Sequence, residues 1–576
     1  MALRARGKPV IEFDPFDLAS ALLMAILLLL ICTTFKEYAI SNDEGLQQHY
    51  GELIIAYYKS GFADRSVFDF RNLYLYGGLF DILAVLIAHF LSVDPYAIRH
   101  VMSALAGLGG ITAAWATGRM IAGPRAGLAA ALALAICGVW YGGMFNHTKD
   151  IPFAAAMMGA SFFLLRAARD LINSRRSDVL WFGVLLGCAL GLRATGLLMI
   201  GYALGVIVLR SWTARKGGWI DLGRDVLRSL AQFVPAFALG YLIMICSWPW
   251  ASLDFFNPAR AIFGFAHFHY PIHTILAGQV YLMSEVPRWY EPVYLAIKLP
   301  FLVLVGTGLA VAWPAWSFAG RTGNSSNRSP GSLAASGPGG GAVLQEIGII
   351  AITVLFPLFC QIAGHGPSFT GMRHFLFIVP PLAELAGIGI HACLSVLETQ
   401  GRSVGLAASL GVAAAFAWDA TTLIKLHPYE YLFYNSLVGG LEGASRRYAT
   451  DYWVNIMPVA VKDLEHYLDR SDARGNPRAL RHSVGVCGER VSFEHEADHR
   501  LRWSPDWDHA DFFIAPTHMN CDQVLRGKIV NVIKSDGVPI GVVKDLRGVS
   551  AQARWTPVEV AHDPARDSDT VKGPHG

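Results

Sequence analysis

Long apolar segments recur along most of the chain and predict a polytopic α-helical membrane protein. They lie near residues 17–36, 73–91, 97–118, 125–143, 152–168, 178–192, 195–210, 229–250, 293–316, 346–363, 373–396 and 403–420. A run of about 18 or more apolar residues can cross the roughly 30 Å hydrocarbon layer of a bilayer. Because lipid offers no partner for backbone polar groups, we expect each crossing segment to be a helix.

Basic residues between these runs predict how the chain is oriented, because Lys and Arg gather on the cytoplasmic side of membrane proteins. They fall near the N-terminus (residues 4–8), at 119–125, at 166–176, at 210–228, at 321–328 and at Arg402. These positions agree only if the run at 73–91, which carries Asp81 and His89, does not cross. The pattern therefore predicts eleven spans, an outer juxtamembrane helix, a cytoplasmic N-terminus and an outward-facing C-terminus.

The composition changes after residue 420 and predicts a small soluble α+β domain over residues 421–556. Helical periodicity around Pro458–Leu468 is followed by four strand-like runs, at 483–486, 512–515, 529–533 and 538–543. The last two flank Ser535-Asp536-Gly537, a good hairpin turn signal. Residues 557–576 and the Gly/Ser/Pro-rich stretch 320–341 are expected to be disordered.

Composition supports the membrane assignment and narrows the possible partners. The chain is 53% hydrophobic and 16% charged, whereas soluble domains carry nearer a quarter charged residues. Its net charge of +3 is too small to suggest a nucleic-acid partner. Six of the eight cysteines lie in or beside apolar runs. The other two, Cys487 and Cys521, can form a disulfide if the soluble domain faces an oxidising compartment.

Candidate chemistry begins with two adjacent carboxylates, Asp43 and Glu44, just past the outer end of the first span. Such a pair can supply a general base or an oxygen-rich metal site. The alternative is an ordinary helix start, with Asp43 near the N-cap.

A second group occupies the short outer turn that holds His147, Lys149 and Asp150. Lys149 and His147 are suited to an anionic group, but Asp150 can also simply cap the helix that starts near Pro152. Arg193 lies at membrane depth, where arginine usually faces a cavity or a partner. Its alternative is to snorkel toward the interface.

Two more outer segments carry polar candidates. Arg373 and His374, with His365 before them, are placed to meet an anion, with snorkelling again the alternative. The long loop 251–292 ends in Tyr290 and Glu291, which are candidate substrate contacts. Its histidines at 267, 269 and 273 are candidate ligands of a metal ion, but no carboxylate lies at a characteristic ligand spacing from them. No metal ligand is assigned, and no P-loop is present.

Together these features resemble the polyprenyl-phosphate-dependent membrane glycosyltransferases of the GT-C class. The likeness is to the family of protein O-mannosyltransferases and lipid A aminoarabinose transferases, glycosyltransferase family 39, and covers roughly residues 10–420. Its carriers are Asp43-Glu44, the run 73–100, residues 149–152 and Arg373-His374. The segment Pro428–Trp453 also looks like the region after the last helix in bacterial members.

The resemblance implies a function and roles for single residues. Asp43 matches the family's catalytic carboxylate and would act as general base on the acceptor hydroxyl. Glu44 would orient the acceptor or the base, and Asp150 would help shape the acceptor or donor site. Lys149, Arg193 and Arg373 are inferred as phosphate contacts from charge and placement.

The donor would be a sugar on a polyprenyl phosphate lying among membrane lipids, and the acceptor a hydroxyl of a lipid, glycan or protein. Direct displacement on the periplasmic side of a bacterial inner membrane would invert the anomeric centre. No cofactor is assigned with certainty, although a divalent metal stays open. The alternatives are a transporter or flippase for lipid-linked sugars, which often shows repeated halves, and a non-catalytic scaffold.

Overall fold

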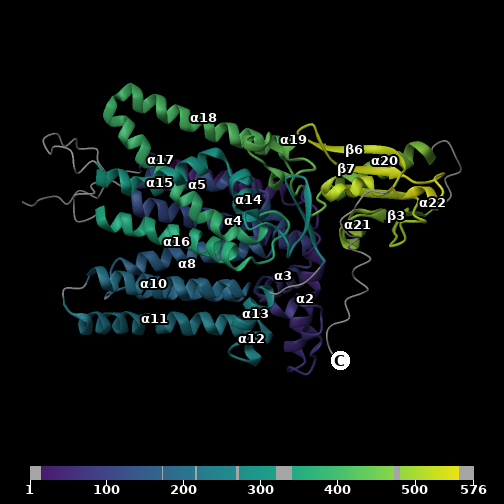
Figure 1. Cartoon of the computed structure of the whole chain (residues 1–576). Helices are drawn as coiled ribbons and strands as arrows, with labels where there is room; N and C mark the ends of the chain where they lie inside the picture. Colours follow the sequence, from purple (N-terminus) through teal and green to yellow (C-terminus); the bar gives the residue numbers. More distant parts are fainter. Residues whose placement is uncertain are drawn as a thin grey trace, which may run out of the picture.

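The protein is a bundle of long helices with a small mixed α/β domain at one end (Figure 1). The computed structural model describes residues 14–171, 173–214, 217–266, 271–319, 340–472 and 481–556. The long helices are α1 (Pro15–Thr34), α4 (Pro95–Ala122), α8 (Asp150–Ala168), α9 (Arg176–Leu190), α10 (Leu197–Ala214), α11 (Trp219–Ser247), α15 (Phe301–Ala319), α16 (Gly340–Gly364), α17 (Val379–Gln400) and α18 (Arg402–Leu426). Among the candidate membrane spans, the one that contains α17 is the most buried, and α17 packs against α15, α18 and α5 (Pro124–Ala135).

The apolar runs are helices, as predicted, and the chain is a multi-span membrane protein. Within the described ranges, eight helices are long and apolar enough to cross a membrane, and two bent helix pairs raise the number to ten. The run predicted at 178–192 forms α9, which has 15 residues and falls short of that length. The count of eleven spans stays a prediction.

The run predicted as one span at 125–143 is broken. Helix α5 is followed by the short helices α6 (Gly138–Tyr141) and α7 (Gly143–Asn146), at a bend of 69°. A Cβ on Gly138 would lie 2.3 Å from the carbonyl oxygen of Glu430, and one on Gly142 would lie 2.3 Å from the amide of Tyr431. The segment after α18 therefore needs glycines here for its close approach.

A second break interrupts the run predicted at 293–316. Helix α14 (Tyr290–Lys298) meets α15 at 113° across Leu299 and Pro300. Proline cannot donate the backbone hydrogen bond that a continuous helix requires. This bend places the end of α14, with Lys298, at the same end of the bundle as the mixed domain.

Two helices lie across that bundle end. They are α2 (Glu44–Lys59) and α3 (Leu79–Leu91), the latter being the run predicted not to cross (Figure 1). The backbone amide of Gly78 donates to Ser247 O at 3.0 Å, and that of Leu79 donates to Gly191 O at 3.0 Å. The start of α3 thus satisfies carbonyls at the ends of α11 and α9. The loop before α14 adds α12 (Pro249–Leu253), α13 (Asn257–Ala266) and a hairpin of β1 (His273–Leu276) and β2 (Gln279–Leu282).

The C-terminal domain contains a five-stranded sheet in the order β4-β3-β5-β7-β6. Its strands are β3 (His482–Val486), β4 (Leu501–Trp503), β5 (Phe512–Pro516), β6 (Lys528–Ser535) and β7 (Val538–Asp545). Strands β4, β3 and β5 are parallel, and β5-β7-β6 are antiparallel. The sequence predicted every strand of this sheet except the three-residue β4, but it did not predict the hairpin of β1 and β2. The predicted hairpin turn is present, with positive φ at Asp536 and Gly537.

Helices complete this domain and the chain leading into it. They are α19 (Gly440–Ala444), α20 (Met457–Asp472), which covers the predicted helix at 458–468, α21 (Arg490–Glu496) and α22 (Ala551–Arg554). Cys487 and Cys521, whose pairing the sequence left open, form a disulfide. Helix α18 continues to Leu426, six residues past the predicted domain boundary at 420. The predicted disorder at 557–576 and over nearly all of 320–341 lies outside the described residues.

Candidate active site

Arg373 joins the two acidic loops that the sequence singled out. It begins the short 3-10 helix η4 (Arg373–Ile378) that leads into α17. Its Nε donates to Asp150 Oδ2 at 2.8 Å, and its Nη2 donates to Asp43 Oδ2. Three segments that are far apart in sequence therefore meet at one guanidinium, whose planar fork suits paired carboxylates.

Asp150 anchors this cluster from inside the bundle. It opens α8, is 2% exposed, and its second oxygen lies 2.9 Å from Arg193 Nη2. Arg193 is 9% exposed, and it precedes the 3-10 helix η3 (Ala194–Gly196). An arginine held inside by a buried carboxylate is not snorkelling, so that alternative is wrong for Arg193. Arg373 is equally enclosed, at 7% exposure.

Asp43 has the position of a helix cap without acting as one. It is the N-cap residue of α2, yet its side chain makes no capping hydrogen bond. The carboxylate instead contacts Arg373 and keeps about a third of its surface exposed. Burial raises the pKa of Asp43, but the charges of Arg373 and Lys149 outweigh it and lower that pKa below its usual value. Asp43 is therefore an ionised, accessible carboxylate.

Lys149 gives the cluster an excess of positive charge. Its Nζ lies 4.0 Å from the ring centroid of Tyr76, and the guanidinium of Arg193 lies 5.9 Å from the same ring. Three cations thus face two carboxylates. Burial lowers the pKa of Lys149 to about 8, assisted by the neighbouring arginines and opposed by Asp43. The cluster is poised to accept an additional anion.

The structure places Glu44 apart from these contacts, although it follows Asp43 directly. Its buried carboxylate accepts from the backbone of Ser41 and lies 3.2 Å from His100 Nε2 and 3.9 Å from Arg99 Nε. Arg99 in turn pairs with Asp81 at 2.7 Å. Glu44 therefore fixes the acidic loop to α4 and points away from the reacting region. Its predicted orienting effect on Asp43 can act only through the backbone.

Two aromatic residues from the segment after α18 cover the cluster, and the sequence did not single them out. The guanidinium of Arg373 lies 4.2 Å from the ring centroid of Trp453. The hydroxyl of Tyr452 lies 2.7 Å from His147 Nε2. Burial lowers the pKa of His147 to about 3, so its imidazole is neutral. The sequence feature that points to these two residues is the aromatic-rich segment Pro428–Trp453, which lies outside the loops between the predicted spans.

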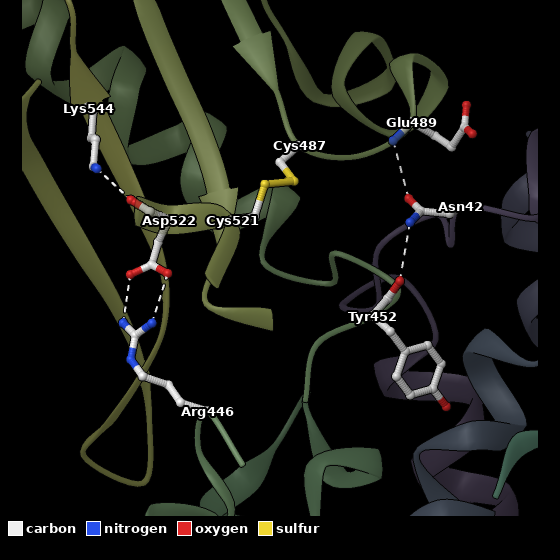
Figure 2. The surroundings of a disulfide bond; sticks show 8 residues. All are labelled: Asn42, Arg446, Tyr452, Cys487, Glu489, Cys521, Asp522 and Lys544. Carbon is white, nitrogen blue, oxygen red and sulfur yellow. Dashed lines mark hydrogen bonds and ion pairs between the residues drawn. A yellow bond between two sulfur atoms is a disulfide. The ribbon is translucent and has the colours of Figure 1, made fainter. Parts of the chain in front are cut away.

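The C-terminal domain also holds the acidic loop in place, as Figure 2 shows. The Asn42 side chain donates to the carbonyl of Tyr452 at 3.2 Å and accepts from the amide of Glu489 at 3.2 Å. Glu489 lies two residues after the disulfide-bonded Cys487. The side chain of Asn42, the residue before Asp43, is therefore hydrogen-bonded both to the segment after α18 and to the mixed domain.

The other predicted residues make no ion pair with the charged cluster, although His374 lies close enough to feel its charges. Tyr290 supports the loop before Arg373, since its hydroxyl accepts from the amide of Gly371 at 3.0 Å. Glu291 is 1% exposed, so its carboxylate is shut off from solvent. The His365 Nε2 lies 2.7 Å from the carbonyl of Val286, and the His374 ring packs edge-on against Phe369. We assign none of these four a direct contact with the reacting groups.

The metal hypothesis gains no support from the part of the chain that is described, where no three His, Cys, Asp or Glu residues gather as a set of ligands. The histidines at 267 and 269 lie outside the described residues. Asp43 and Asp150 are both neutralised by arginine, and a metal ion would have to displace those guanidinium groups.

A family model described as dolichyl-phosphate-mannose-protein mannosyltransferase matches residues 81–244. This segment contains Asp150, Lys149 and Arg193, whereas Asp43 and Arg373 lie outside it. No curated relative matches the chain significantly.

Among solved structures, ArnT from Cupriavidus metallidurans bound to undecaprenyl phosphate is similar at 16% identity and a TM-score of 0.48, over 92% of this chain and 98% of that one. The Archaeoglobus fulgidus oligosaccharyltransferase is similar at 12% identity and a TM-score of 0.42, over 86% and 65%. The segment that matches the family model covers less than a third of the chain and includes three residues of the charged cluster.

Proposed function

We propose that the cluster around Arg373 is the catalytic site at which a sugar passes from a polyprenyl phosphate to a hydroxyl acceptor, with inversion. The observation that carries the proposal is the sharing of Arg373 by Asp43 and Asp150. One of these carboxylates is accessible and the other is buried. The accessible one is suited to proton transfer, and the buried one to holding cations in place.

Asp43 is the general base in this scheme. It removes the proton of the acceptor hydroxyl as the oxygen attacks the anomeric carbon, and the bond from that carbon to the phosphate oxygen breaks. The leaving group is a phosphate, already a weak base, so no general acid is needed. Lys149, Arg193 and Arg373 stabilise the charge that develops on this phosphate.

The contact between Asp43 and Arg373 links donor binding to the strength of the base. Arg373 holds the pKa of Asp43 low, and a carboxylate with a low pKa is a weak base. A donor phosphate that engages Arg373 neutralises part of this charge, so the pKa of Asp43 rises. The base therefore becomes effective when the donor is in place.

We place the site on the periplasmic side of a bacterial inner membrane, with the N-terminus in the cytoplasm. The basic turns at 119–125 and 166–176 support this orientation through the positive-inside rule. The disulfide of the mixed domain, which lies at the same bundle end as the cluster, agrees with an oxidising compartment. Acceptors on that side are lipids, glycans and proteins.

The transporter alternative fits the observations less well. A flippase needs basic contacts and a path for the lipid, but it has no use for a base at the mouth of the site. Asp43 is the N-cap residue of α2 but makes no capping hydrogen bond, so its carboxylate is free to act as a base. This feature and the family match at 81–244 both favour the enzyme. A scaffold gives no reason for three cations to surround two carboxylates.

The test is glycan and lipid analysis of cells that carry Asp43→Asn beside wild type. We expect loss of one glycoconjugate, because a general base contributes about 10²–10⁴-fold to rate. The matched control is Asp69→Asn, an exposed acid in the same outer region, which should leave all glycoconjugates unchanged. If Asp43→Asn protein accumulates normally and no glycoconjugate changes, the catalytic proposal fails.

A further inference from the structure

Lys298 is a buried lysine without an anionic partner in the described part of the chain. It ends α14 and is 3% exposed. Its Nζ donates to the carbonyl of Tyr431 at 2.9 Å and lies 3.8 Å from the ring centroid of Tyr434. No carboxylate among the described residues pairs with it. A buried ammonium normally has a carboxylate partner, because removing it from water costs several kcal/mol.

A small pocket lies beside this side chain. Its polar lining includes Lys298, His147, Arg373 and Tyr452, and Thr370 and Gly371 also border it. The pocket is small, so it suits one small charged group rather than a whole substrate.

The pocket is distinct from the cationic side of the cluster. Lys149 and Arg193 both face the ring of Tyr76, and none of these three lines the pocket. Arg373 belongs to both places. Two candidate anion-binding sites therefore border the guanidinium of Arg373, one beside Lys149 and one beside Lys298.

We infer that the Lys298 pocket binds an anionic group of the acceptor, a phosphate or a carboxylate, next to the hydroxyl that Asp43 deprotonates. The inference rests on the proposed function and names its acceptor class. The Lys149 side already offers surplus positive charge to the donor phosphate, so the acceptor is the remaining substrate that can place an anion beside Lys298. An anion there supplies the charge partner that Lys298 lacks.

The test uses purified full-length protein in detergent and two probes, undecaprenyl phosphate and inorganic phosphate. Undecaprenyl phosphate at saturation fills the donor side, and inorganic phosphate is then titrated while thermal stability is followed. Wild type should show a saturable rise in Tm. Lys298→Met should weaken inorganic phosphate at least tenfold and change undecaprenyl phosphate affinity less than twofold.

The control is Lys544→Met, which removes another buried lysine that donates to backbone carbonyls, in the mixed domain. It should bind both probes as wild type does. If Lys298→Met weakens undecaprenyl phosphate instead, Lys298 belongs to the donor site and the inference is wrong. Unchanged binding of both probes, or no phosphate response in wild type, also overturns it. Lys298→Gln replaces Met if that variant does not fold.

These outcomes are separate from the test of catalysis. A failed catalytic proposal appears as unaltered glycoconjugates in cells carrying Asp43→Asn. The binding measurement does not depend on turnover, so the two failures can be distinguished.

Discussion

Replacing Arg373 by methionine should destabilise the protein, because it leaves two carboxylates without their shared cation. Asp150 is 2% exposed and keeps Arg193 as a partner at 2.9 Å. Breaking a buried ion pair by removing one partner costs about 3–5 kcal/mol. The surviving Arg193 contact places Arg373→Met near the lower end of that range. Asp43 is about a third exposed, so its share is screened and adds at most about 1 kcal/mol.

A double-mutant cycle isolates the part of this cost that belongs to the pair. The variants are Arg373→Met, Asp150→Asn and the combination, each followed by thermal unfolding in detergent at fixed lipid content. Because both groups are buried and in contact, we expect a coupling of about 1–3 kcal/mol. The double variant should therefore be more stable than the sum of the single effects predicts.

The conservative variant Arg373→Lys separates charge from geometry. Lysine keeps the positive charge but cannot present the two parallel donors that reach Asp43 and Asp150. It should recover much of the stability and little of the activity. Additive single effects, or an Arg373→Met protein as stable as wild type, would refute the pairing. Full activity in Arg373→Lys would show that the guanidinium geometry does not matter.

Three further expectations follow from the same contacts. The pKa of the Lys149 ammonium is lowered to about 8, so this group loses its proton as the pH rises through 8. The affinity for undecaprenyl phosphate should therefore fall between pH 7 and 9. Lys149→Arg should abolish that fall. Replacing Cys487 and Cys521 by serine removes a cross-link between residues 34 positions apart. In the chain-entropy model this loss lowers the free energy of unfolding by about 3–4 kcal/mol. The Tm should drop, and reductant should no longer affect it. Trp453→Leu removes a cation–π contact with Arg373, worth about 1–2 kcal/mol when desolvated; turnover should fall about tenfold with protein levels unchanged.

The sequence predicted the helices well because a bilayer leaves few alternatives for apolar segments of that length. It did not predict the breaks at Gly138 and Pro300. Hydropathy depends only on the apolar residues within a segment. It carries no information about other segments whose backbone packs against that segment. Gly138 is required only because residues 430–433 lie against it, and that contact joins segments about 290 residues apart. A proline inside an apolar run signals a bend, but not that the bend is as large as 113°.

The charged cluster was predictable in part for a topological reason. Alternation of spans places Asp43, Asp150 and Arg373 at one end of the bundle whenever the run at 73–91 does not cross, and these residues do meet. Topology assigns residues to an end but does not aim their side chains. Glu44 follows Asp43 and yet faces His100, since successive residues at a helix start point in different directions. Lys298 was passed over because it stands alone at the end of an apolar helix.

The cluster also changes how the chain beyond the last span is understood. A soluble domain that only selected acceptors would touch the membrane part at its rim. Here Trp453 lies on the guanidinium that both carboxylates share, and Asn42, next to the proposed base, is held by Tyr452 and Glu489. Tyr452 and Arg373 also line the Lys298 pocket. The site is therefore complete only when the segment after α18 is docked, so acceptor binding and the position of the base depend on the same contacts.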